Sequence, residues 1–133
     1  MPIRLEIITA ERVLFDDQVD AIVAPGAEGE LGVLPHHAAV MTTLQAGELT
    51  YRTGGEEIHF VVQGGFMDIQ GDQVVVLADA AEHVEEIDVP RAEEAIRRAQ
   101  ERIDSRSEDI DLERALASLQ RAGIRLRVMR RRG

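Results

Sequence analysis

Residues 87–133 read IDVPRAEEAIRRAQERIDSRSEDIDLERALASLQRAGIRLRVMRRRG. This stretch contains the short pattern ID-x-x-RA twice, first at Ile87 and again at Ile110. In both copies an Asp stands where a helix N-cap is expected, because its carboxylate accepts hydrogen bonds from first-turn amides. Pro90 agrees with a helix start, since an early helical position has no partner for the missing N–H. We therefore expect two helices, joined by residues 104–109 into a helical hairpin.

The apolar residues of both expected helices recur at spacings of three and four, as on one face of an amphipathic helix. The first helix carries the stripe Val89, Ala92, Ile96, Ala99 and Ile103. The second has a heptad-like seam made of Leu112, Ala115, Leu119, Ala122, Leu126 and Met129. Because the seam is rich in Ala, the hairpin buries little area and is expected to be marginally stable alone. Gly123 is a further weak point in the second helix.

Before about residue 81 the pattern changes to short strands separated by turn signals. Ile3, Leu5 and Ile7 alternate with polar residues, as in a half-buried strand. Gly54-Gly55 and Gly71-Asp72 each separate two strand-like runs, which predicts two β-hairpins. Many short strands with Gly at the turns are typical of a sandwich or barrel. The sequence therefore predicts an α+β chain of two modules, an antiparallel β-sandwich at residues 1–86 and an α-helical hairpin at residues 87–133.

Composition excludes several classes of function. The chain has no Cys, and its 15 basic residues are all Arg, which excludes thiolate nucleophiles, Cys-bound zinc, a P-loop lysine and Schiff-base chemistry. No apolar run approaches the ~20 residues that cross a bilayer, so we expect no direct membrane insertion. Adjacent His36 and His37 lack further ligands at a suitable spacing, so no metal site is predicted. No nucleophile–base constellation is visible either, which predicts a non-catalytic protein.

Charge is distributed unevenly along the chain. Residues 1–89 contain 3 Arg and 17 acidic residues, a formal charge of −14, whereas residues 90–133 contain 12 Arg and 8 acidic residues, a formal charge of +4. The basic helical module is expected to bind an acidic protein surface. Nucleic acid is not an expected partner, because no aromatic platform accompanies the Arg residues and the acidic module would repel a phosphate backbone.

A set of charged residues in and before the hairpin forms a candidate polyphosphate site: Glu82, Asp88, Arg91, Arg98, Arg121 and Arg125. Two Arg are seven residues apart on the first helix and two are four apart on the second, so each pair shares a helix face. Guanidinium groups pair bidentately with phosphate oxygens, and the acidic residues can accept from an amino group or a ribose. The alternative is a solvated helix face, because Arg in the first helix have Glu neighbours at three or four residues. Spacing leaves both interpretations open.

Three motifs occur in a specific order along the chain: GELGVLPHH at residues 29–37, GGFMDI at 64–69 followed by VVVLAD at 74–79, and ID-x-x-RA at 87. Together they resemble the ε subunit of bacterial and chloroplast F-type ATP synthases, and the resemblance spans the whole chain. It implies a non-catalytic rotor subunit of the central stalk. Such a subunit requires no cofactor and is a peripheral protein at the cytoplasmic face of the bacterial plasma membrane.

The resemblance also implies partners and site residues. The sandwich would bind the γ subunit and the c-ring, with Glu30 and His37 facing the c-ring. By itself, their stretch is typical of a loop and a short strand with tight turns. The helices would inhibit ATP hydrolysis by binding the acidic C-terminal region of a β subunit. The α subunit would be a further partner. The six charged residues match the ATP site of some family members, which makes ATP a regulatory ligand and not a substrate. A free-standing ATP-binding sensor is the alternative function.

Overall fold

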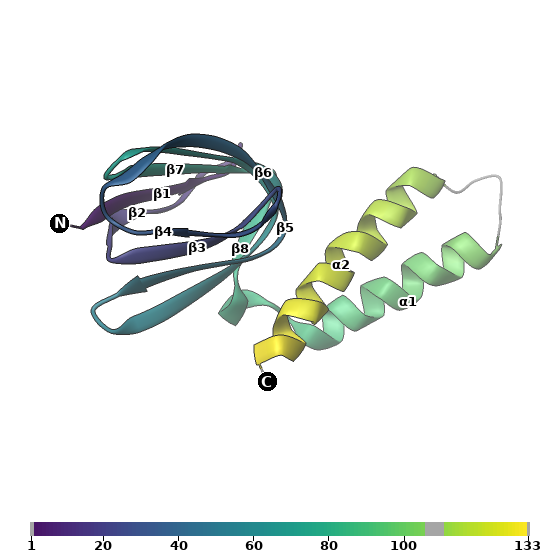
Figure 1. The fold of residues 1–133 in the computed structure, drawn as a ribbon. Coiled ribbons are helices and arrows are strands. Elements are labelled where there is room, and N and C mark those ends of the chain that lie inside the picture. Colours follow the sequence, from purple (N-terminus) through teal and green to yellow (C-terminus); the bar gives the residue numbers. More distant parts are fainter. Residues whose placement is uncertain (1, 106–110, 133) are drawn as a thin grey trace. The chain divides into compact units, whose positions relative to one another are not determined.

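A computed structural model describes residues 2–105 and 111–132 of the chain (Figure 1). The chain divides into two compact units, Met1–His83 and Val84–Gly133. This division lies three residues before the boundary expected from the sequence. Most of the expected connection at residues 104–109, and Ile110 of the second motif copy, lie outside the described residues.

The first unit is built from strands, as the sequence predicts. In the described part of this unit they are β1 (Ile3–Ile8), β2 (Val13–Val19), β3 (Ala21–Gly26), β4 (Gly29–Val33), β5 (His37–Thr53), β6 (Glu56–Gly71), β7 (Gln73–Ala78) and β8 (Ala81–His83). They pair in the order β2-β1-β7-β6-β5-β3-β4, and β8 pairs with β6. The predicted β-sandwich is confirmed; its antiparallel pattern has one exception, the parallel pair of β1 and β7.

Two turns that the sequence predicts connect β5 to β6 and β6 to β7. Gly54 (φ 58°) and Gly55 (φ 83°) join β5 to β6, and both have the positive φ that a type I′ hairpin turn requires. Gly71 and Asp72 join β6 to β7. Both predicted hairpins are therefore confirmed.

Gly65 marks the point at which β6 changes its partner strand. Residues 60–62 of β6 pair with β8, whereas residues 65–70 pair with β7. Gly65 has a φ of +128°, and a Cβ added there would lie 2.1 Å from the backbone oxygen of Leu77. Glycine is the residue that permits both this backbone conformation and this close approach of two strands.

The core of the sandwich is mostly aliphatic, in agreement with the low aromatic content of the chain. Ile3, Leu5 and Ile7 of β1 are fully buried, which confirms the alternation read from the sequence. Phe60 is the largest fully buried side chain, and Tyr51 stacks on Phe15 with ring centroids 4.4 Å apart. The remaining members come mainly from β3, β5, β6 and β7, so the core lies between the strands and binds them into one unit.

The second unit consists of a short 3-10 helix, η1 (Val84–Glu86), and two α-helices, α1 (Val89–Ser105) and α2 (Leu112–Arg132). Asp88 accepts the backbone N–H of Arg91 at 3.1 Å, and Asp111 accepts that of Arg114 at the same distance. The two copies of the sequence pattern thus form matching N-caps, and both predicted helix starts are confirmed.

The two α-helices pack side by side in opposite directions (Figure 1). Ala92 and Ala99 of α1 are buried, and the buried residues of α2 include Ala115, Ala122 and Leu126. Leu112, which the sequence places in the seam, is half exposed instead, because it is the first residue of α2. The seam is therefore formed largely by Ala, so each contact buries little apolar area.

Candidate functional site

The two residues expected to face the c-ring lie at different places in the sandwich. Glu30 lies on β4, where it pairs with Pro25 of β3 and is exposed. The neighbouring β3 residue, Gly26, pairs with Leu44 of β5. His37 is the first residue of β5 and pairs with Gly71. His37 and Leu44 are seven positions apart along β5, so Glu30 and His37 lie at different levels of the sheet.

The turn before His37 has an unusual backbone. Pro35 and His36 form this turn, and His36 has a φ of 65°, the one positive φ of a non-glycine residue in the described part of the chain. Its backbone N–H donates to Oδ1 of Asp72 at 2.9 Å. The imidazole Nδ1 of His36 lies 3.8 Å from the same oxygen. The side chain of Asp72 thus connects the β6–β7 turn to the β4–β5 turn.

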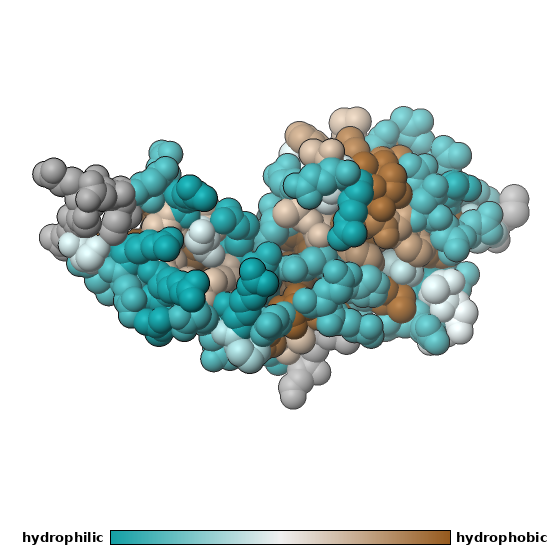
Figure 2. Space-filling view, turned by 180° about the vertical axis from the view of Figure 1, so that it is seen from behind, coloured by the Kyte–Doolittle hydropathy of each residue, from teal (hydrophilic) through white to brown (hydrophobic). Residues whose placement is uncertain are grey.

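An apolar row crosses the outer face of the sheet. Phe66 pairs with Leu77, Leu77 with Ile8, and Ile8 with Val13, so the four side chains lie side by side across β6, β7, β1 and β2. Phe66 and Leu77 are each 52% exposed, and Val13 is 58% exposed. We call these four residues the outer apolar row. Figure 2 shows apolar surface on the sandwich, bordered by hydrophilic side chains.

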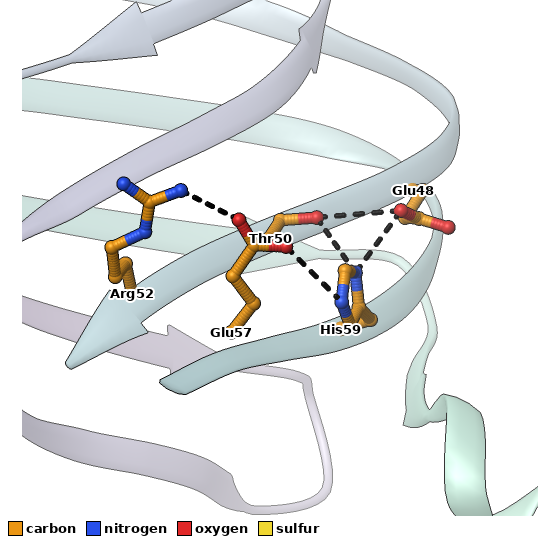
Figure 3. A network of polar contacts seen from close by, with 5 residues as sticks. All are labelled: Glu48, Thr50, Arg52, Glu57 and His59. Atoms are coloured by element: carbon orange, nitrogen blue, oxygen red, sulfur yellow. Dashed lines mark hydrogen bonds and ion pairs between the residues drawn. The ribbon is translucent and has the colours of Figure 1, made fainter. Parts of the chain in front are cut away.

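A polar cluster lies on the β5–β6 hairpin (Figure 3). His59 Nδ1 lies 3.0 Å from the hydroxyl of Thr50 and 3.1 Å from Oε1 of Glu48, while its Nε2 lies 3.8 Å from Glu57. Arg52 donates to Glu57 at 2.6 Å. Cross-strand pairs of opposite charge stabilise a hairpin by a few tenths of a kcal/mol up to about 1 kcal/mol each. This geometry explains the cluster as reinforcement of the hairpin.

The six residues expected to bind ATP are divided between the two units. Glu82 lies on β8 in the first unit, and the other five lie at or within the helices of the second. Asp88 is the N-cap of α1 and bonds the backbone of Arg91. The corresponding Asp111 makes the same bond at α2, so this contact is explained by helix capping.

Two Arg residues of α1, Arg97 and Arg98, are paired with acidic residues of the same helix. Arg98 donates Nε to Oε1 of Glu94 at 3.2 Å. Arg97 donates to Glu94 and Glu101. The hydrogen bond from Arg97 is the largest cause that lowers the pKa of Glu94 from 4.5 to about 2, and the positive charges of both Arg residues add to it. A phosphate that binds Arg98 therefore has to compete with Glu94.

Helix α2 has few acidic residues of its own. It contains seven Arg and one Glu over its 21 residues. Arg121 is exposed and donates to the hydroxyl of Ser118 at 3.2 Å, while Arg125 is half buried. Most of the positive charge of the second unit is thus on α2. The ATP site stays a prediction, since these contacts neither build nor exclude a nucleotide pocket.

Neither metal ligands nor a membrane-spanning helix occur in the described part of the chain. Within residues 2–105 and 111–132, no three His, Asp or Glu side chains are grouped as metal ligands. In the same residues, no helix combines the length and apolar character needed to cross a bilayer. The features that remain as candidate functional sites are the outer apolar row, the turn at His36 and the Arg-rich helix α2.

Known families account for both units. Residues 2–84 match the family described as "ATP synthase, Delta/Epsilon chain, beta-sandwich domain", and residues 85–130 match its "long alpha-helix domain". The chain belongs to the ATP synthase delta/epsilon chain family. The resemblance stated from the sequence motifs is thereby confirmed, and the chain is a non-catalytic subunit of an ATP synthase.

Members of the family resemble the chain over almost its full length. The ATP synthase epsilon chain of Dehalococcoides mccartyi is 50% identical over 131 residues, which cover 98% of this chain and 94% of that one. The epsilon chain of Herpetosiphon aurantiacus is 45% identical over 132 residues, 99% and 97% of the two chains. A chain in the structure of Euglena gracilis mitochondrial ATP synthase with OSCP, F1 and c-ring superimposes with a TM-score of 0.71. It is 26% identical and covers 96% of this chain and 76% of that one.

Two features of this family member were not predicted from its sequence. Phe66 points outward although it is one of only three Phe in the chain. Its neighbour Met67 is fully buried, so the strand alternation alone places Phe66 on the outer face. The contact of Asp72 with His36 was not predicted either. The sequence gives one weak indication of it, because residues 35–36 are Pro-His where a type II turn usually has Pro-Gly.

Proposed function

We propose that this chain is a rotor subunit of the central stalk, which couples the c-ring to the γ subunit at the cytoplasmic face of the membrane. The observation that carries the proposal is the outer apolar row, three of whose members are more than half exposed. Exposed apolar patches of this kind mark protein–protein contacts. Family membership supports γ as the subunit that covers the row.

Substitution of Phe66 tests this docking surface. Because about half of Phe66 is already buried, its removal from the interface loses about half of the 1.5–3 kcal/mol for a whole side chain, or about 0.8–1.5 kcal/mol. Phe66→Ser in the full chain should then weaken binding to purified γ subunit roughly four- to thirteenfold. Val23, exposed on β3, is the matched control, since Val23→Ser removes an apolar side chain outside the row. Equal losses in the two variants would contradict docking through the row.

The sandwich also contacts the c-ring in this proposal, through Glu30 and His37. Both residues come from the motif on which the family resemblance rests, and Glu30 is exposed. Glu30→Gln and His37→Ala should each weaken association of the full chain with a purified γ–c-ring complex while leaving binding to γ alone unchanged. Unchanged association with the complex in both variants would remove these residues from the contact.

The second unit restrains ATP hydrolysis in this proposal. Helix α2 supplies the basic surface, because the Arg97 and Arg98 side chains of α1 bond to Glu residues of their own helix while α2 contains one Glu against seven Arg. Such a surface complements the acidic C-terminal region of a β subunit, and of α. Truncation after Glu86 should leave assembly intact and raise the ATPase activity of the complex. Unchanged hydrolysis at every nucleotide concentration would contradict the inhibitory role.

ATP is the proposed regulatory ligand of the helical unit. The support is the set of six matching residue types, with Arg121 and Arg125 on the helix that carries most of the positive charge. Calorimetry on the full chain should show ATP affinity reduced roughly ten- to a hundredfold by Arg125→Ala, the loss of one charge-assisted pair. Arg127→Ala, which removes an Arg outside the set, is the control. Equal effects of the two variants would show that only net charge matters.

A further inference from the structure

The turn between β4 and β5 adopts a conformation that its sequence does not favour. Pro35 occupies its second position and His36 its third, and His36 has a positive φ. A turn with Pro at the second position and a positive φ at the third is of type II, in which Gly usually occupies the third position. A residue with a side chain held there is strained, and such strain persists only where surrounding contacts enforce it.

Asp72 supplies the enforcing contact. Its Oδ1 accepts the backbone N–H of His36 at 2.9 Å, across 36 residues of sequence. The backbone of Asp72 is itself fixed, because its carbonyl oxygen accepts the N–H of Arg4 at 2.7 Å and its turn is closed by the β6–β7 ladder. The carboxylate of Asp72, in a turn that is fixed by β1 and by the β6–β7 ladder, thus fixes the backbone of the β4–β5 turn.

The next residue after this turn is His37, which pairs with Gly71, the residue immediately before Asp72. The position of His37 is therefore determined on one side by the turn and on the other by the strand ladder. Leu34, at the start of the same turn, is 64% exposed. The turn presents its side chains to solvent on a backbone that is fixed in advance, which lowers the entropy cost of binding.

We propose that Asp72 is a positioning residue for the partner contact of the β4–β5 turn. It holds His36 in the left-handed conformation and thereby sets the direction in which His37 and Leu34 are presented. This inference rests on the c-ring contact proposed above for His37. Asp72 itself does not touch the partner; it acts through the backbone of His36.

Two substitutions of Asp72 separate its hydrogen bond from its charge. Asp72→Ala removes the acceptor, whereas Asp72→Asn keeps an acceptor oxygen at the same place. By amide hydrogen exchange on the full chain, the His36 amide should exchange roughly tenfold faster or more in Asp72→Ala. Asp72→Asn should remain close to the parent chain. An unchanged His36 amide in Asp72→Ala would overturn the structural part of the inference.

Binding to a purified γ–c-ring complex tests the functional part. Asp72→Ala should weaken association roughly fivefold or more, because only the fraction of chains with the formed turn is competent to bind. His36→Gly in the same chain should restore the affinity, since Gly adopts a positive φ without help. Asp20→Ala is the control, because Asp20 accepts the N–H of Gly54 at 3.2 Å and so connects a different pair of turns. This control should bind like the parent.

The outcomes distinguish the inference from the function on which it rests. If the double variant Asp72→Ala/His36→Gly binds as weakly as Asp72→Ala alone, Asp72 or His36 contacts the partner directly and the positioning role is wrong. A different result would be that His37→Ala binds like the parent while the His36 amide still exchanges faster in Asp72→Ala. The proposed c-ring contact of His37 would then be wrong, and the positioning role of Asp72 with it. The hydrogen bond that holds the turn would still be confirmed.

Discussion

Gly123→Ala should stabilise the helical unit. Gly123 lies in the interior of α2, and a Cβ added there meets nothing within 4 Å outside the backbone of its own helix. Gly costs a helix interior about 0.8–1.0 kcal/mol relative to Ala, and no clash offsets this gain. For a unit of about 50 residues, a gain of about 1 kcal/mol corresponds to a rise in Tm of at least about 4–8 °C. Thermal unfolding followed by helical circular dichroism on the full chain measures this shift.

The same chemical change at Gly55 is a control with the opposite expected sign. A Cβ at Gly55 also meets nothing within 4 Å, but Gly55 has a φ of +83°. Gly55→Ala should therefore destabilise the sandwich by about 1–2 kcal/mol through backbone strain alone. If Gly123→Ala lowers the Tm of the helical transition or leaves it unchanged, helix propensity does not limit the stability of α2 and the reasoning fails.

Three further outcomes are expected. Gly65→Ala should leave little folded sandwich in far-ultraviolet circular dichroism, because its Cβ would lie 2.1 Å from a backbone oxygen; a native spectrum would show that β6 and β7 can separate there. Because the pKa of Glu94 is lowered to about 2, its ionised form stabilises α1 above pH 4.5 and this contribution is lost as the pH falls toward 2. A carbon-13 NMR titration checks this, and Arg97→Gln should return the midpoint toward 4.5. Asp88→Ala and Asp111→Ala should each cost their helix about 0.5–2 kcal/mol in denaturant unfolding; a much larger loss for Asp88 would indicate a role beyond capping.

Local signals predicted the helical unit well. The carboxylate of an N-cap acts within its own helix turn, so Asp88 and Asp111 could be recognised from neighbouring residues alone. The glycines at the strand turns, Gly54, Gly55 and Gly71, were equally local, because a positive φ is a property of single residues. Strand order was not predictable in this way. The parallel pairing of β1 with β7 joins segments about 70 residues apart, and no short pattern encodes it.

The candidate sites were likewise predictable in their local features and not in their long-range contacts. Residue types in a motif, such as His37 or the six charged residues, could be named from the sequence, but their contacts could not. The sequence left open whether Arg98 binds a phosphate or pairs with a neighbouring Glu, and in the structure it donates to Glu94. The contact between His36 and Asp72 spans 36 residues and depends on two turns meeting in space. It became visible only with the fold.

The Ala-rich seam of the helical unit has a consequence for how quickly its helices can part and rejoin. Ala92, Ala99, Ala115 and Ala122 are the buried small residues of this seam. An Ala side chain has no rotamers to lose on burial, so re-forming these four contacts requires no search among side-chain conformations. The buried side chains of α2 that must select a rotamer are Leu126 and Val128, both in the last third of the helix. Interlocking of buried side chains is thus confined to one end of α2, and the rest of the seam can re-form as a smooth surface.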